Sequence, residues 1–283
     1  MRILLCLAAL FLALAVAGAG GGGAAPRHLV ALERTIFSPA LDGRLGIEIY
    51  LPPSYAHGSR RYPVVYFLHG LPAASTAYRG SRFLADALAQ TGRDAIVVAP
   101  QGARDGDSDP EYLDWGTARN WETALNRDVV AYVDGHFRTI ANRRGRALLG
   151  LSAGGYGAMP LALHHLGSFS VVESWSGYFH PADRAGVRAL DLGSPQRNAR
   201  SSAHAYVPAL RRATARLPTL IAFYVGRADR RFRAENERFH RELRQAHVRH
   251  VFGLYAGGHE QRLWTTHAVP WLLLALNHLA QPR

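Results

Sequence analysis

Short apolar runs alternate along the chain with stretches whose apolar residues recur at helical spacing. Runs of branched apolar residues are typical of buried strands, and the helical spacing is typical of amphipathic helices. Strands are predicted at 29–38, 43–52, 63–70, 94–100, 146–152, 169–177, 219–226 and 250–258, the first two as a hairpin. Helices are predicted at 82–92, 121–137, 155–166, 233–247 and 262–279. This order predicts an α/β fold: one domain with a mostly parallel central sheet and helices on both faces.

Three local signals refine this prediction. Gly92 is expected to end the helix that precedes it, because glycine favours the left-handed turn after a helix. Pro160 is expected near the first turns of its helix, where a missing backbone N–H costs little. Residues 180–217 are polar and rich in Ser, Pro and Arg, and they are predicted to be an irregular insertion.

The N-terminal segment has the pattern of a secretory signal peptide. Arg2 precedes an apolar run from Ile3 to about Val16, and small residues follow it. The run is shorter than the roughly 20 residues that a spanning helix needs. We therefore expect residues 1–25 to be a cleaved signal, residues 28–283 to form the folded domain, and the protein to be secreted or held in the cell envelope without a membrane span.

Composition adds two constraints. The chain has 283 residues, 48% hydrophobic, which suits one large core, and its single cysteine, Cys6, lies inside the predicted signal, so no disulfide is expected. The formal charge is +12, but all 33 basic residues are arginine and they are scattered. This scatter favours a solvated surface over a nucleic-acid partner, and leaves open a loose attraction to an acidic cell wall.

The sequence from Gly150 to Gly154, Gly-Leu-Ser-Ala-Gly, joins a predicted strand directly to a predicted helix. In such a turn the two glycines let strand and helix approach, and the serine is presented at the tip. The helix N-terminus there favours developing negative charge. Ser152 is therefore the candidate nucleophile, although a glycine-rich turn without chemistry has the same local pattern.

A serine hydroxyl needs a base to act as a nucleophile at neutral pH, and the base is oriented by a carboxylate. His259 follows the last predicted strand, where the chain order Ser, acid, His places the base. Asp229 follows the strand before it and is the candidate acid. Glu235 is the alternative acid, and a helix-capping role is the alternative for Asp229.

Two backbone amides are predicted to bind the oxyanion of an acyl-transfer intermediate. One is that of Ala153, directly after the nucleophile, and the other is that of Leu71, in the loop after an early buried strand.

No cofactor is predicted. Asp105, Asp107 and Asp109 resemble the start of a calcium loop, but Pro110 stands where that loop needs glycine and Gly116 where it needs glutamate. No run of His, Cys or carboxylate residues has zinc spacing, and no phosphate-binding glycine loop is present. Neither a metal nor an organic cofactor is therefore expected.

The chain resembles the α/β-hydrolase esterase family that groups esterase D (S-formylglutathione hydrolase), bacterial feruloyl esterases and the antigen 85 mycolyltransferases. The resemblance extends from about Ile36 to Leu279. The motifs that carry it are YFLHGLPA, YLDWGTARNWETAL, GLSAGGYGAM, SWSGYFHPAD, YVGRAD and AGGHEQRLW.

This resemblance implies Ser152 as nucleophile, His259 as base, and Leu71 and Ala153 as oxyanion donors. For the acid, the esterase D and feruloyl branches imply Asp229, and the antigen 85 branch implies a glutamate near Glu235. Antigen 85 enzymes carry an arginine after the oxyanion leucine, where this chain has Pro72. The export signal also differs from the cytosolic setting of S-formylglutathione hydrolase.

The expected activity is that of a serine ester hydrolase acting on small-molecule or glycan-linked carboxylic esters through an acyl-enzyme. Acyl transfer to a sugar or envelope hydroxyl uses the same intermediate and stays open, as does a non-catalytic envelope-binding protein of the same fold. The loop at 101–120 and the insertion at 180–217 are expected to shape the pocket. Four aromatic residues either contact substrate or pack in the core: Tyr112, Trp115, Trp175 and Tyr178.

Overall fold

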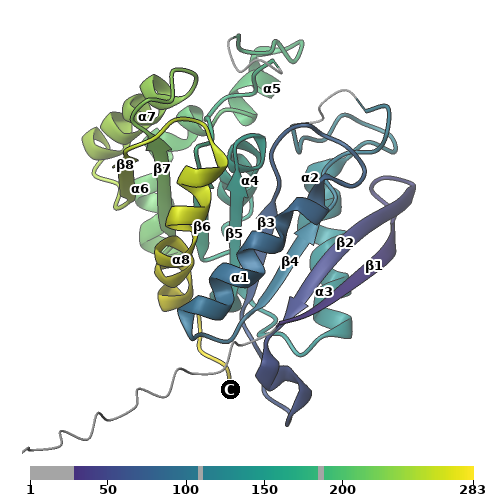
Figure 1. Cartoon of the computed structure of the whole chain (residues 1–283). Coiled ribbons are helices and arrows are strands. Elements are labelled where there is room, and N and C mark those ends of the chain that lie inside the picture. The colour runs from purple at the N-terminus through teal and green to yellow at the C-terminus, as the bar shows by residue number, and fades with distance from the viewer. Residues whose placement is uncertain (1–28, 108–110, 184–187) are drawn as a thin grey trace, which may run out of the picture.

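One mixed sheet of eight strands organises the molecule (Figure 1). The computed structural model describes residues 29–107, 111–183 and 188–283, so the predicted signal peptide and Cys6 lie outside the described residues. The strand order is β1-β2-β4-β3-β5-β6-β7-β8. The strands are β1 Val30–Ser38, β2 Gly43–Leu51, β3 Val64–Leu68, β4 Ile96–Pro100, β5 Arg146–Leu151, β6 Val171–Trp175, β7 Leu220–Gly226 and β8 Val251–Tyr255.

The strand directions agree with the sequence prediction. β1 and β2 form an antiparallel hairpin, β2 pairs antiparallel with β4, and all pairs from β4 to β8 are parallel. Parallel strands bring their carboxyl ends to one edge of the sheet. Because β5 lies in the middle of the order, the turn that follows it is at the centre of this edge.

Helices cover both faces of the sheet, as predicted. The helices are α1 Arg82–Thr91, α2 Trp121–Thr123, α3 Val130–His136, α4 Ala153–His164, α5 Pro195–Arg200, α6 Val207–Arg216, α7 Arg233–Gln245 and α8 Gln261–His278, with a π-helical segment Ala124–Val129 joining α2 to α3. Figure 1 shows α1 and α8 side by side in front of the sheet, where Leu88 and Leu272 belong to one buried cluster. Residues of α3, α4, α6 and α7 belong to the larger cluster on the other face.

Local signals at the helix ends have mixed outcomes. Gly92 ends α1 with φ 67°, in the left-handed region, as predicted. Pro160 is the eighth residue of α4 and therefore lies beyond the first turns, contrary to expectation. The side chains of α4 are buried from Ala153 to Leu163, so tertiary packing outweighs the backbone hydrogen bond that Pro160 cannot make.

The prediction of an irregular insertion at 180–217 is wrong in its second half. This segment contains α5, a short 3-10 helix at Ala203–Tyr206, and α6. Ser194 caps α5 by accepting a hydrogen bond from the amide of Arg197 at 3.2 Å. In α6 only Val207 and Leu210 are buried, so its apolar signal is confined to two positions in an arginine-rich stretch.

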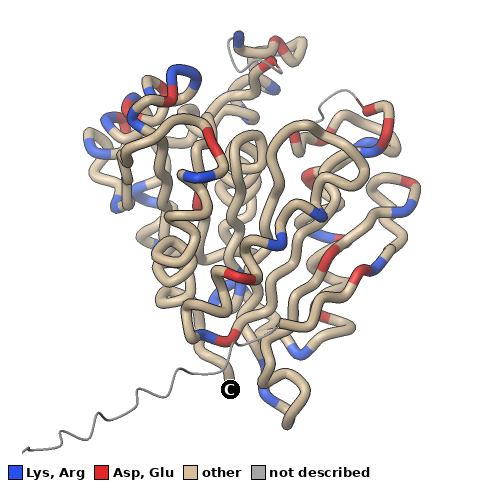
Figure 2. The backbone as a smooth tube through the Cα atoms, in the orientation of Figure 1, with Lys and Arg blue, Asp and Glu red and all other residues tan. Residues whose placement is uncertain are grey.

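Charged residues of both signs are interspersed along the described chain, as Figure 2 shows, and strands β3 and β4 carry none. No described helix has both the length and the apolar character needed to cross a membrane.

Candidate active site

The turn between β5 and α4 holds Ser152 in a backbone conformation that side-chain-bearing residues rarely adopt, with φ 55° and ψ −119°. Its amide donates to the carbonyl of Trp175 at 2.9 Å. A Cβ atom on Gly150 would lie 2.0 Å from the carbonyl oxygen of Gly154, and one on Gly154 would lie 2.0 Å from that of Leu68. Both glycines are thus needed for the close approach that the sequence pattern predicts.

A continuous chain of hydrogen bonds runs from Ser152 to Asp229. Ser152 Oγ is 2.9 Å from His259 Nε2, and His259 Nδ1 is 2.9 Å from Asp229 Oδ2. Ser152 follows β5, Asp229 follows β7 and His259 follows β8, so all three lie at the carboxyl edge of the sheet. The structure therefore brings together the three residues that the sequence selected.

Aromatic side chains hold the His259 ring in place. Phe232 and Trp264 each meet it edge to face with ring centroids 5.1 Å apart. The indole N–H of Trp264 donates to Ser176 Oγ at 3.1 Å. The imidazole is thereby fixed against rotation away from Ser152.

Asp229 is buried and remains suited to carry a negative charge. Burial alone would raise the pKa of its carboxyl group, but the hydrogen bond and charge of His259 and the amides of Phe232 and Arg231 hold that pKa below its ordinary value. Both amides donate to Asp229 Oδ1, at 3.1 and 3.0 Å, which leaves Oδ2 for the imidazole. An ionised carboxylate in this position favours the His259 tautomer with its proton on Nδ1, which leaves Nε2 free to accept the proton of Ser152.

Glu235, the alternative acid, has different partners. It is in the first turn of α7, and its Oε1 accepts the amide of Phe179 at 2.9 Å and contacts the rings of His180 and His204. Among the described contacts, Asp229 is the carboxylate at His259 Nδ1.

The two predicted oxyanion donors flank the nucleophile. Ala153 is the first residue of α4, so its amide has no acceptor one turn back in the helix. Leu71 follows Gly70, on which a Cβ would lie 3.1 Å from the Ser152 Cβ. The Leu71 loop therefore runs directly beside Ser152.

His69 fixes the start of this loop, a role that the sequence analysis did not assign to it. Its Nδ1 donates to the carbonyl of Gly70 at 2.8 Å, and its Nε2 accepts the amide of Gly102 at 3.1 Å. Burial lowers the pKa of this imidazole, which favours the neutral ring that both contacts require. Tyr112 adds a hydrogen bond from its hydroxyl to the carbonyl of His69 at 2.6 Å.

A cavity of about 450 Å³ opens beside Ser152 and His259. Its walls are mainly apolar, and besides Ser152 and His259 the polar residues in its lining are His69, Thr76, Ser81, Arg231 and Gln261. The larger side chains in its lining are Phe67, Leu71, Pro72, Phe83, Leu151, Arg231, Gln261 and Trp264. A mainly apolar cavity beside the serine hydroxyl suits a small ester.

No described residue of 101–120 or 180–217 lines this cavity. The 101–120 loop acts on its shape through Gly102 and Tyr112, which hold the lining residue His69, whereas the expectation is wrong for the described part of 180–217. Three of the four aromatic candidates are buried, and their polar atoms are used internally. Tyr112 bonds to the carbonyl of His69, Trp175 Nε1 donates to Glu173 at 2.8 Å, and the Tyr178 hydroxyl donates to Glu111 at 2.8 Å. Trp115 is half-buried and stacks with Arg197. These aromatics pack in the structure and do not line the cavity.

The aspartates that resemble a calcium loop are engaged elsewhere. Asp105 accepts the amide of Ser75 at 3.2 Å, and Asp107 pairs with Arg104 and Arg119. Asp109 and Pro110 lie outside the described residues.

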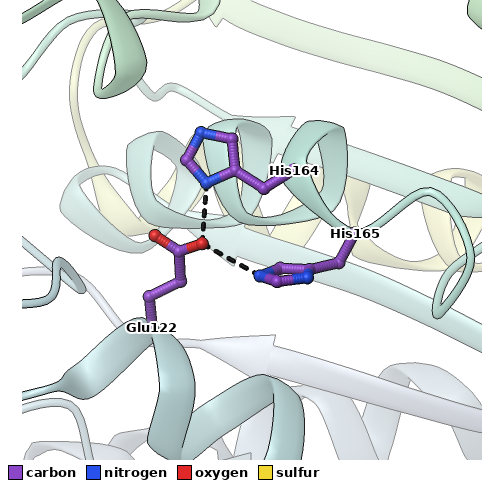
Figure 3. A group of neighbouring side chains, drawn as sticks. All are labelled: Glu122, His164 and His165. Atoms are coloured by element: carbon purple, nitrogen blue, oxygen red, sulfur yellow. Dashed lines mark hydrogen bonds and ion pairs between the residues drawn. The ribbon is translucent and has the colours of Figure 1, made fainter. Parts of the chain in front are cut away.

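A histidine–carboxylate cluster lies between α2 and the end of α4 (Figure 3). Glu122 Oε1 accepts from His164 Nδ1 at 2.7 Å and from His165 Nε2 at 2.9 Å, and Arg200 Nη2 lies 3.5 Å from the same oxygen. Burial alone would raise the pKa of Glu122, but these three partners lower it to about 2. The cluster ties α2, α4 and α5 together.

A pH dependence of stability follows from this cluster. The pKa of Glu122 is lower in the folded chain than in the unfolded one, so ionised Glu122 stabilises the fold above about pH 4.5, and this contribution is lost as the pH falls toward 2. We expect Glu122→Gln to lower the free energy of unfolding by about 2 kcal/mol at pH 5.5, with the difference from wild type shrinking by pH 2.5. Urea titrations over this range measure it.

Glu237→Gln is the matched control, because Glu237 forms a partly exposed pair with Arg233 and contributes at most about 1 kcal/mol. A Glu122→Gln difference that stays constant from pH 5.5 to pH 2.5 contradicts the expected linkage.

The model of the family described as "Putative esterase" matches residues 38–273. The chain belongs to this esterase family. An esterase of Mycobacterium tuberculosis is 33% identical over 138 residues, which are 49% of this chain and 30% of the relative. The matched segment therefore spans less than a third of the length of that relative.

Solved esterase structures share the fold. A ferulic acid esterase has a TM-score of 0.74 at 24% identity, covering 89% of this chain and 98% of its own. An S-formylglutathione hydrolase from Agrobacterium tumefaciens has a TM-score of 0.74 at 20% identity, covering 89% and 96%. These likenesses agree with the α/β-hydrolase fold of the esterase family that the sequence resembles.

Proposed function

We propose that the chain is a serine carboxylic-ester hydrolase with Ser152 as nucleophile, His259 as general base and Asp229 as the carboxylate that orients it. The observation that carries this proposal is the pair of 2.9 Å contacts linking Ser152 Oγ, His259 and Asp229 Oδ2 beside a cavity. Membership of the esterase family supports it.

The reaction follows from the positions of these groups. His259 Nε2 takes the proton of Ser152 Oγ as the oxygen attacks the ester carbonyl, and the amides of Leu71 and Ala153 donate to the oxyanion. The imidazolium, stabilised by ionised Asp229, then protonates the departing alkoxide. His259 then takes a proton from a water molecule as that water attacks the acyl-serine, and the imidazolium returns the proton to Ser152 Oγ as the ester bond to Oγ breaks and the acid is released.

The proposed substrates are small carboxylic esters. The apolar cavity walls suit an acyl or aryl group, and the structural neighbours include a protein named ferulic acid esterase and an S-formylglutathione hydrolase. A first panel therefore contains p-nitrophenyl acetate and methyl ferulate as carboxylic esters, with S-formylglutathione as a thioester for comparison.

We also propose export. This part rests on the sequence of residues 1–25 alone, with the esterase domain at 28–283.

Labelling with a fluorophosphonate tests the nucleophile. We expect an adduct on Ser152 in the purified protein, located by peptide mass spectrometry, because an activated serine attacks the probe and an ordinary serine does not. The adduct is expected to vanish in His259→Ala, which keeps Ser152 and loses the base, and after heat denaturation. If folded wild-type protein carries no adduct, or carries it on another residue, the proposal is wrong.

A further inference from the structure

A second cluster of histidine and carboxylate side chains lies where the loop after β6, the 180–217 segment and α7 meet. His180 follows β6, His204 belongs to the 3-10 helix Ala203–Tyr206, and Glu235 is in the first turn of α7. One ligand atom of each lies within 4.8 Å of the other two. Three separate segments supply these atoms, so a search for metal-binding spacing along the sequence does not find them.

His204 lies between two carboxylates. Its Nδ1 is 2.5 Å from Glu242 Oε2, and its Nε2 is 3.3 Å from Glu235 Oε1. A neutral imidazole has one N–H, which satisfies one of these oxygens. If that N–H is on Nδ1, the lone pair of Nε2 faces Glu235 Oε1 at a side chain that is only 11% exposed, and a second ring proton or a cation between ring and carboxylate makes this contact favourable.

One distance fits a cation between its two atoms, whereas His180 Nδ1 forms a short hydrogen bond to the same Glu235 oxygen and must move away from it when an ion binds. The 3.3 Å between His204 Nε2 and Glu235 Oε1 is long for a hydrogen bond. Two ligand atoms, each about 2.0–2.1 Å from a tetrahedral zinc ion, are about 3.3–3.4 Å apart. Two imidazole nitrogens and one carboxylate oxygen suit zinc, whereas magnesium and calcium prefer oxygen ligands.

The surroundings supply the outer contacts that zinc-binding histidines have. Glu242 holds the other nitrogen of the His204 ring, as carboxylates do behind zinc ligands, and Arg238 pairs with Glu242 at 2.7 Å. The amide of Phe179 donates to Glu235 Oε1 at 2.9 Å and positions that carboxylate. The side chain of His180 is 36% exposed, which leaves a route for the ion and for a water ligand.

We propose that His180, His204 and Glu235 bind one zinc ion, with Glu242 orienting the His204 ring. The ion links α7 to the start of the 180–217 segment, at His180, and to its 3-10 helix, at His204. This proposal does not depend on the proposed esterase activity, because none of these residues belongs to the Ser152–His259–Asp229 chain.

The Glu122 cluster of Figure 3 also has two histidines and one carboxylate, but an arginine lies beside its carboxylate, so it serves as the internal control. There Arg200 Nη2 is 3.5 Å from the same carboxylate oxygen that both histidines contact, so a fixed positive charge opposes a bound cation. At the proposed site the neighbouring guanidinium, that of Arg238, pairs with Glu242 and not with a ligand. His165→Ala is therefore the matched control for histidine loss.

Zinc titration tests the proposal. Protein purified without a polyhistidine tag and treated with EDTA is titrated with ZnCl₂ by calorimetry, and its metal content is measured after dialysis. We expect one zinc ion per chain, a rise in melting temperature on binding, and no comparable binding of MgCl₂. We expect Glu242→Gln to weaken binding about 10- to 100-fold and His180→Ala and His204→Gln to weaken it by more than about 100-fold.

Circular dichroism establishes that each variant is folded, and His180→Ala tests the site at its most exposed ligand, where loss of the fold is least expected. His165→Ala is expected to bind zinc as the wild type does. The proposal is overturned if folded wild-type protein binds no stoichiometric zinc, if His180→Ala and His204→Gln both retain it, or if His165→Ala loses it. Fluorophosphonate labelling of Ser152 reports on the esterase proposal separately.

Discussion

Ser152→Ala is expected to lower kcat for ester hydrolysis by about 10⁵- to 10⁶-fold, to the level of background catalysis. The substitution removes the hydroxyl oxygen that lies 2.9 Å from His259 Nε2, on a residue that lines the cavity. Without Ser152 Oγ no acyl-serine can form. The remaining catalysis is direct attack of water on the ester, assisted only by the oxyanion amides. Hydrolysis of p-nitrophenyl acetate under saturating substrate measures the loss.

Ser170→Ala is the control for this result. Ser170 directly precedes β6, at the edge of the sheet opposite Ser152, and its buried Oγ has no hydrogen-bond partner among the described residues. Its removal is expected to leave kcat unchanged within twofold, because no described polar contact is lost. If folded Ser152→Ala retains more than about one hundredth of wild-type kcat, the nucleophile is another group.

The sequence was informative about the site because of how parallel sheets are built. Branched apolar runs mark the buried strands, and residues placed just after three of those strands must meet at one edge. Ser152, Asp229 and His259 each satisfy this condition, and Gly150 and Gly154 reveal the tight turn because a side chain at either position has no room. Position after a strand thus predicts proximity without any knowledge of side-chain angles.

The features that sequence reasoning missed depend on contacts between distant segments. Glu122 in α2 contacts His164 in α4, and His204 in the 180–217 segment contacts Glu235 in α7. The residues of each pair are far apart in the sequence, so no local spacing indicates the contact. The helix α6 went undetected because it buries only two apolar residues, and Pro160 was misplaced because the packing of α4 outweighs a local rule. These contacts and helix positions depend on tertiary packing, which cannot be derived from the local pattern of a single sequence.

Asp229→Asn is expected to lower kcat by about 10³- to 10⁴-fold while leaving the fold intact. An asparagine oxygen can still accept the amides of Arg231 and Phe232, so the loop keeps its shape. The asparagine NH₂ then faces His259 Nδ1 and favours the tautomer with the proton on Nε2. That nitrogen can no longer accept the proton of Ser152, so the base fails although every residue is still in place.

Glu235→Gln distinguishes the two acids that the sequence left open. Glu235 contacts His180, His204 and the amide of Phe179, so its effect on His259 is indirect, and we expect a loss of at most about tenfold in kcat. Both variants are compared at equal folded fraction, judged by melting curves. A large loss in Glu235→Gln with a small one in Asp229→Asn assigns the acid to α7 and means that the loop after β7 moves away from His259 during turnover. The opposite ranking, which the 2.9 Å contact between His259 Nδ1 and Asp229 Oδ2 predicts, makes the carboxylate after β7 the group that sets the tautomer of the base.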